Sequence, residues 1–157
     1  ERNKEFNIDR LIELFNKYGI YLVIEDALDG TKVRGCMKVI SNNPAIYMTK
    51  YLKEKSSFYF ALYHELGHVK TDYNKAKNKI IVDDGDTNTN EKKADDFAIN
   101  QMIDSKIWKQ IINDYSNKDK ICKDNKIPLC FLYSRLAYEE YIKYNSIEYN
   151  NHRCKIN

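Results

Sequence analysis

Near the start of the sequence, apolar side chains recur every three to four positions over residues 7–18, the spacing of a helix with one buried face. Asn7 is suited to the N-cap and Gly19 to the position after the last turn, so a helix is predicted between them. Turn-forming segments then separate three short runs of strand-like composition, at residues 20–25, 34–40 and 45–49. The pattern predicts a small antiparallel sheet of about three strands.

Helical spacing returns over residues 56–71. The expected core contacts of this second helix are Phe58, Ala61, Leu62, Leu66 and Val69. Residues 72–90 are polar, and a connection of that length inside a compact domain is often functional. Helical spacing resumes over residues 90–103 and continues through most of the remaining chain, with interruptions near Asn125 and Pro128. Helices packed with one small sheet make an α+β fold.

With 157 residues the chain is long enough for one domain with its own core, so a single domain over residues 1–157 is predicted, with a polar tail from about residue 145. The 26 basic and 23 acidic side chains leave a net charge of +3, which gives no reason to expect direct nucleic-acid binding. No stretch approaches the roughly 18 apolar residues of a membrane span, so no membrane partner is expected.

The four cysteines lie far apart in the sequence, at positions 36, 122, 130 and 154, without a CxxC pair. Their spacing does not match a zinc knuckle and nothing suggests secretion, so reduced thiols in a cytoplasmic protein are expected. The first residue is Glu1 rather than Met, already within amphipathic sequence, so a fragment of a longer protein is expected, which leaves room for an upstream domain.

The stretch "FALYHELGHVK", residues 60–70, holds two of the three histidines of the chain. His64 and His68 are four residues apart, so on a helix they share one face with Cβ atoms about 5–6 Å apart. That separation suits two imidazoles binding one zinc ion at about 2.0–2.1 Å. Glu65 lies one residue round the helix, where its carboxylate can reach a water on the metal. This is the HExxH pattern, in which the glutamate is the general base of a metal-assisted hydrolysis.

A catalytic zinc needs a third protein ligand and one open position. The third histidine, His152, lies in the polar tail, so a carboxylate is the better candidate. Glu91 and Asp95 are again four residues apart, at the start of a predicted helix. Glu91 would bind the metal, and Asp95 would accept the free ring N–H of a ligand histidine, which fixes the tautomer of that ring.

Each part of this pattern has a simpler explanation. The histidines of an isolated HExxH can be surface or capping residues, and an isolated Glu91 can be an acidic residue favoured at a helix N-terminus. The order of the two segments, with the carboxylates about two dozen residues after HExxH, favours a metal site.

"HELGH" followed by "EKKADDFA" resembles the ImmA/IrrE family of bacterial and phage zinc metallopeptidases, whose pattern is HExxH and then E-x-x-A-[ND]-x-F-A. The resemblance extends over roughly residues 11–144. "IPLCFLYSRLAYEEYI" is similar to a helical segment in versions encoded with, or fused to, HigA-type helix-turn-helix antitoxins. The resemblance implies a zincin-like architecture with the HExxH helix at its core.

By this resemblance His64, His68 and Glu91 map onto the zinc ligands, Glu65 onto the general base and Asp95 onto the Asn/Asp position of the motif. The function implied is zinc-dependent cleavage of a peptide bond in a protein substrate, namely a helix-turn-helix repressor or antitoxin. A missing upstream DNA-binding domain would fit the same picture.

Two further assignments are weaker. An extended substrate commonly pairs with an edge strand beside the active site, and residues 45–49 are the candidate, with an ordinary core strand as the equal alternative. Tyr133, Arg135 and Tyr138 are candidates to stabilise the oxyanion, although structural roles are favoured for all three.

Three other functions compete with the enzyme. A metallopeptidase-like module can bind a regulator without cutting it, but an intact Glu65 argues against this, since a structural metal needs no adjacent base. DNA binding by the C-terminal helices is disfavoured by the interleaved acidic residues and low net charge. A secreted general protease is the weakest alternative, since no signal or disulfide framework supports it.

Overall fold

A computed structural model of the chain describes residues 6–27, 30, 32–82 and 89–156. This part of the chain has an α+β fold, which confirms the predicted class. It contains one small sheet of four strands: β1 (Tyr21–Glu25), β2 (Gly35–Ile40), β3 (Asn43–Thr49) and β4 (Ile81–Val82).

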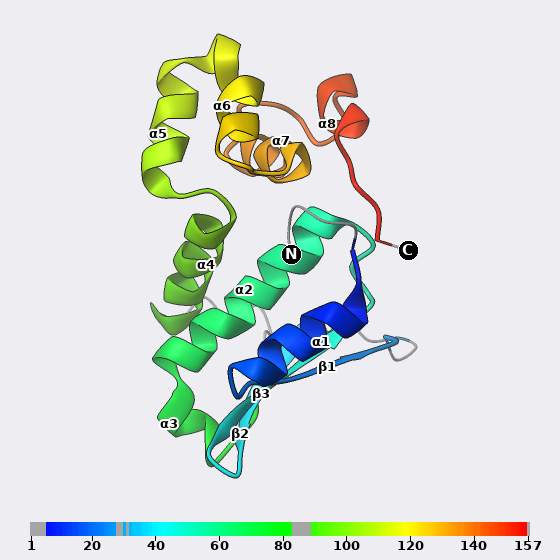
Figure 1. The fold of residues 1–157 in the computed structure, drawn as a ribbon, viewed down its shortest axis with the longest axis vertical. Coiled ribbons are helices and arrows are strands. Elements are labelled where there is room, and N and C mark those ends of the chain that lie inside the picture. The colour runs from blue at the N-terminus through cyan, green and yellow to red at the C-terminus, as the bar shows by residue number, and fades with distance from the viewer. Residues whose placement is uncertain (1–5, 28–29, 31, 83–88, 157) are drawn as a thin grey trace. The chain divides into compact units, whose positions relative to one another are not determined.

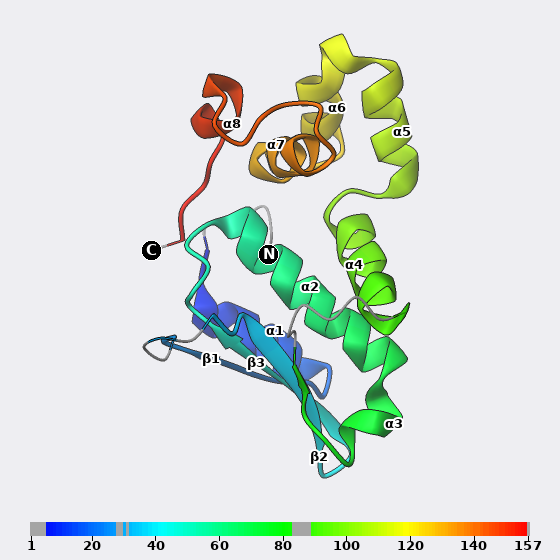
Figure 2. The ribbon, with the colours of Figure 1, turned by 180° about the vertical axis from the view of Figure 1, so that it is seen from behind.

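The order of strands in the sheet is β1-β3-β2-β4 (Figures 1 and 2). Strands β2 and β3 form an antiparallel hairpin, whose turn residues Ser41 and Asn42 have φ angles of 49° and 67°. Positive φ at both central residues is typical of a type I′ turn, which matches the twist of the strands it joins. The hairpin places β3 beside β1, and this pair is parallel. The sheet is therefore mixed, whereas a purely antiparallel one was expected, because the order of strands depends on pairing that strand patterns do not encode.

One face of the sheet is buried and the other is partly exposed. Residues paired across the strands share a face, so Leu22, Ile46 and Met37 lie together, and each is almost fully buried. On the opposite face Tyr21 and Tyr47 keep 45% and 38% of their surface exposed. This alternation is typical of a sheet that packs helices against one face only.

The helices agree with the predicted ones, except that residues 72–90, expected to be a polar connection, include a short helix. The described chain contains α1 (Ile8–Lys17), α2 (Lys55–Thr71), α3 (Tyr73–Ala76), α4 (Thr89–Met102), α5 (Ser105–Asn113), a 3-10 turn (Tyr115–Asn117), α6 (Lys118–Asp124), α7 (Leu129–Tyr138) and α8 (Ile147–Asn151). The expected interruptions lie between α6 and α7. The residues expected to form only a polar tail include helix α8, which Ser146 caps by accepting a hydrogen bond from the Tyr149 backbone N–H. Throughout the residues described, no helix is both long and apolar enough to cross a membrane.

The chain divides into two compact units. The sheet unit consists of Asn7–Leu52 and Ala61–Ala98, and the helical unit of Glu1–Phe6, Lys53–Phe60 and Ile99–Asn157. Two of the four boundaries, after Phe60 and after Ala98, fall inside continuous helices, α2 and α4. The single domain expected over residues 1–157 stays a prediction.

Within the sheet unit, α1 lies against one face of the sheet, in front of it in Figure 1 and behind it in Figure 2. Asn7 caps this helix, because its side chain accepts a hydrogen bond from the Arg10 backbone N–H at 2.8 Å. Leu11 is the buried residue of α1, whereas Leu14 and Tyr18 are 37% and 73% exposed. The predicted start and end of α1 are therefore observed, but Leu14 and Tyr18, expected on its buried face, are exposed.

Within the helical unit, the core is made by Phe58, Phe131 and the apolar residues of α5 and α7. The C-terminal segment pairs with the residues before α2 through an isolated bridge between Glu54 and Lys155. The Lys55 backbone N–H at the start of α2 donates to the Cys154 carbonyl at 2.7 Å. The start of the HExxH helix thus has a backbone partner from the end of the chain.

Candidate metal centre

The buried stripe of helix α2 changes from apolar to polar along its length. Phe58 and Leu62 are buried as expected, and the same stripe continues with Glu65, His68 and Asp72, which are 1%, 1% and 3% exposed. Residues at this spacing follow one another along a single face of a helix. The expected core residues Leu66 and Val69 are only half-buried. Ionisable side chains therefore occupy buried positions along this face of the helix, within the sheet unit.

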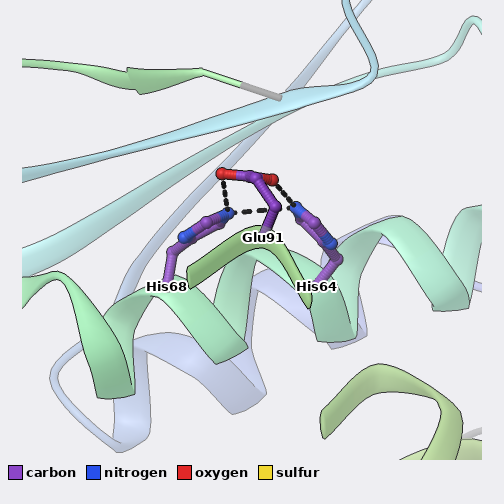
Figure 3. Close-up of side chains that lie close together, drawn as sticks. All are labelled: His64, His68 and Glu91. Atoms are coloured by element: carbon purple, nitrogen blue, oxygen red, sulfur yellow. Dashed lines mark hydrogen bonds and ion pairs between the residues drawn. The ribbon is translucent and has the colours of Figure 1, made fainter. Parts of the chain in front are cut away.

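Three of the predicted site residues converge. His64 and His68 extend from α2 toward Glu91 in the first turn of α4, as Figure 3 shows. The two Nε2 atoms are 3.0 Å apart, and the Glu91 carboxylate oxygens lie 3.2 Å from Nε2 of His64 and 3.3 Å from Nε2 of His68. One ligand atom from each residue lies within 4.8 Å of the other two, so the three side chains could hold a metal ion.

The other nitrogen of each ring is held by a carboxylate. His64 Nδ1 donates to Asp95 Oδ1 at 2.8 Å, and His68 Nδ1 donates to Asp72 Oδ2 at 3.0 Å. With the proton on Nδ1, each Nε2 has its lone pair directed toward the centre. Two lone pairs and a carboxylate then face one another at about 3 Å, an arrangement that a cation between them stabilises. The chemistry of the donor set therefore fits a metal ion.

Asp95 occupies the position expected for a residue that orients a ligand histidine, but Asp72 was missed. The signal was available, because Asp72 follows His68 by four residues and so lies on the same face of the helix. Each of the two histidines consequently has its own carboxylate, one from α4 and one from Asp72, directly after the last residue of α2.

Asp72 is held as a carboxylate by its surroundings. Burial alone would raise its pKa, but hydrogen bonds from His68, Thr71, Lys75 and Asn90 outweigh burial and hold the pKa well below its usual value. The contacts are short, with Thr71 Oγ1 donating at 2.8 Å and Asn90 Nδ2 at 2.7 Å. An ionised Asp72 is the form that accepts the Nδ1 proton of His68.

Two small residues allow α2 and α4 to approach closely. A Cβ atom placed on Gly67 would lie 2.7 Å from the Cα of Ala94, closer than real Cβ atoms come to other atoms. Gly67 is the fourth residue of HELGH, and Ala94 lies between Glu91 and Asp95. The contact therefore occurs where both helices carry the residues of the site, and it lets side chains from the two helices meet.

Glu65, the predicted general base, lies inside the same unit. Its carboxylate is 1% exposed and packs against Gly35 at the start of β2, where an added Cβ would be 2.8 Å from Oε1. Burial and, to a lesser degree, the negative charge of Glu65 raise the pKa of the nearby Cys36 thiol. Its role as a base stays a prediction.

Of the two weaker predictions, the structure contradicts one and gives no support to the other. Residues 45–49 belong to β3, which is hydrogen-bonded to β1 on one side and β2 on the other. The strand has no free edge, so the prediction that it pairs with an extended substrate is wrong.

Tyr133 and Arg135 have partners within the helical unit. Tyr133 donates to Asp119 at 2.8 Å and stacks on His152, while Arg135 bonds Glu139 and the Ile103 carbonyl, both at 2.8 Å. These contacts agree with the structural roles favoured from the sequence. They give no support to either side chain as a donor at the reaction centre.

Comparison with known proteins adds one finding to this geometry. A search of curated protein sequences found no match to this chain. A scan against protein-family models matched residues 53–114 to the family described as Peptidase U49. The match covers less than half of the chain, but it spans the helix with both histidines and the helix with Glu91 and Asp95. The similarity therefore supports a peptidase function for the segment in which the candidate ligands lie.

Proposed function

We propose that this protein is a zinc-dependent endopeptidase in which His64, His68 and Glu91 bind the metal and Glu65 is the general base. The observation that carries the proposal is the convergence of these three side chains, with ligand atoms 3.0–3.3 Å apart. In a tetrahedral zinc site with bonds of about 2.0–2.1 Å, neighbouring ligand atoms are about 3.3–3.4 Å apart. Two imidazoles with one carboxylate also form a ligand set that zinc favours in hydrolases.

The metal, when bound, lowers the pKa of a bound water and polarises the peptide carbonyl. The chain supplies the remaining groups. Asp95 and Asp72 hold the Nδ1 protons of the two histidines, so that both rings present Nε2 as ligand atoms. Glu65 accepts a proton from the attacking water and later transfers it to the leaving amine.

The burial of Glu65 supports this role. Glu65 is 1% exposed, so its carboxylate is shielded from bulk solvent. Glu65 also directly follows His64 on the helix that carries two of the three ligands.

For the substrate we propose a helix-turn-helix repressor or antitoxin that the peptidase inactivates in a regulatory switch. The support is the resemblance of "HELGH" and "EKKADDFA" to the ImmA/IrrE family, together with the C-terminal segment similar to versions encoded with HigA-type antitoxins. The Peptidase U49 match agrees with the reaction class and does not address the substrate.

The variant Glu65→Gln tests the enzyme against a non-cleaving binding module. The wild-type chain and the variant are each expressed with a candidate helix-turn-helix repressor, and both intact repressor and bound zinc are measured. We expect one zinc ion per chain in both proteins, because Glu65 is not a ligand. Cleavage is expected with the wild type alone, because loss of the base removes about 10²–10⁴-fold of the rate.

The matched control is Glu13→Gln, which makes the same change on the exposed side of α1. It is expected to cleave like the wild type. Equal loss of repressor with the wild type and Glu65→Gln would refute the role of Glu65. Stable binding of the repressor without cleavage by the zinc-loaded wild type would favour the binding module.

A further inference from the structure

The side chain of Asp72 has an unusual set of partners for its position in the fold. It stands at the N-cap of α3, where an aspartate usually accepts a hydrogen bond from a backbone N–H of the first turn. Asp72 makes no such bond through its side chain, although that side chain is buried. Its carboxylate instead makes four contacts with other side chains.

Each oxygen of the carboxylate has two of these contacts. Oδ2 accepts hydrogen bonds from His68 Nδ1 at 3.0 Å and from Thr71 Oγ1 at 2.8 Å, both on α2. Oδ1 accepts from Asn90 Nδ2 at 2.7 Å on α4, and it pairs with Lys75 Nζ at 3.0 Å. One carboxylate therefore bonds both of the helices that carry candidate ligands.

Asn90 directly precedes Glu91 in the first turn of α4. A bond between Asn90 and Asp72 limits the movement of the backbone that carries Glu91, just as the bond to His68 limits the rotation of that ring. The two restraints meet in one buried side chain. By contrast, Asp95 contacts His64 from within α4 and lies one turn beyond Glu91.

We propose that Asp72 is a positioning residue that holds His68 directly, and Glu91 through Asn90, in the arrangement in which zinc binds. The inference rests on the proposed function, because it assigns a role in the same metal centre. Its physical basis is preorganisation: ligands that are already fixed lose less conformational entropy when the metal binds. Carboxylates hydrogen-bonded to ligand histidines typically contribute about 10–100-fold in metal affinity.

The test compares the full chain with Asp72→Asn, Asn90→Ala and the double variant. Zinc dissociation constants are measured by competition with a chromophoric chelator. We expect Asp72→Asn to weaken zinc binding by about 10–100-fold. Asn90→Ala is expected to weaken it less, because the bond between Asp72 and His68 remains. The double variant should lose less affinity than the product of the two single effects, because part of both acts through one shared bond.

A second readout does not depend on the metal. In the metal-free protein, imidazole nitrogen NMR signals report which ring nitrogen of His68 carries the proton. We expect Nδ1 to be protonated in the wild type and in Asn90→Ala, and this preference to be lost in Asp72→Asn. The control is Asp104→Ala, which removes the aspartate that caps α5 through the Lys106 backbone N–H and should leave both readouts unchanged.

Wild-type zinc affinity in both single variants would overturn the inference while leaving the proposed function standing. A wild-type chain that binds no zinc would overturn the proposed function, and the NMR readout would still decide whether Asp72 fixes His68. If Asp72→Asn fails to fold, the half-buried Asn90→Ala carries the test, and unchanged affinity in that variant refutes the link to Glu91.

Discussion

At the scale of single residues, the candidate site depends on a carboxylate for each histidine. The partner of His64, Asp95, was predicted from its spacing within α4. The partner of His68 was not, because an aspartate that follows a helix is ordinarily interpreted as a turn or capping residue. The structure assigns Asp72 its role through bonds from residues as far away in the sequence as Asn90, which local patterns do not reveal.

The cysteines give a residue-scale prediction that is independent of the metal. All four are free, as expected, but their environments differ. Burial raises the pKa of Cys122 to about 12, and the negative charge of Asp119 adds to the effect. Cys154 is exposed. Because the thiolate is the reactive form, we expect an alkylating reagent near neutral pH to modify Cys154 more than about 100-fold faster than Cys122.

Mass spectrometry of the alkylated protein over time measures both rates. Repeating the reaction in denaturant is the control, and there the two cysteines should react at similar rates. Rapid labelling of Cys122 in the folded protein would contradict the observed packing of α6.

At the scale of elements, the approach of α2 and α4 determines whether side chains from the two helices meet. Gly67 and Ala94 make this approach possible, and both lie inside the sequence motifs that suggested the site. Spacing alone predicted which residues share a helix face. It did not predict that the small residues between them are the contact surface of the two helices.

The variant Gly67→Ala tests this contact, because the expected change in stability has opposite signs with and without the close approach of the two helices. Alanine is favoured over glycine in a helix by about 1 kcal/mol, so the change would stabilise a helix with free space at this position. Here the added methyl group meets the backbone of α4, and overpacking of this kind costs about 1–3 kcal/mol. We therefore expect a net loss of stability in chemical denaturation, together with weaker zinc binding.

Lys93→Ala is the control, because it changes an exposed residue beside Ala94 in α4. Its stability should stay within about 0.5 kcal/mol of the wild type. An increase in stability for Gly67→Ala would show that the helices are farther apart than the structure places them.

Sequence patterns predicted the local features of the helices but not the long-range pairing of the strands. The helices were predicted closely, since helical periodicity, the Asn7 cap and the break before Pro128 are local signals. Strands β1, β2 and β3 were located, but their order was not predicted and β4 was missed. Strand β3 pairs with β1 as well as with its hairpin partner β2. The pairing with β1 joins residues more than twenty positions apart in the sequence, such as Tyr21 and Ala45. For that reason β3 is central, and the expectation of a substrate-binding edge there failed.

At the scale of the whole molecule, the candidate ligands belong to one compact unit. His64, His68 and Glu91, together with Asp72 and Asp95, all fall within the sheet unit. The helical unit has a separate network of side-chain contacts. In it, Cζ of Arg135 lies 4.2 Å from the centroid of the Trp108 ring, and both side chains donate hydrogen bonds to Glu139. The proposed chemistry therefore needs only residues of the sheet unit, and the helical unit remains the part of the chain for which no catalytic role is proposed.

In the proposed site, two imidazoles and one carboxylate bind a single zinc ion. X-ray absorption at the zinc edge, recorded on the zinc-loaded full chain, tests it most directly. We expect nitrogen and oxygen ligands at about 2.0–2.1 Å, with the scattering pattern of two imidazoles and no sulfur. A zinc–sulfur distance of about 2.3 Å would show that cysteines bind the metal instead, and it would contradict the assignment of His64, His68 and Glu91.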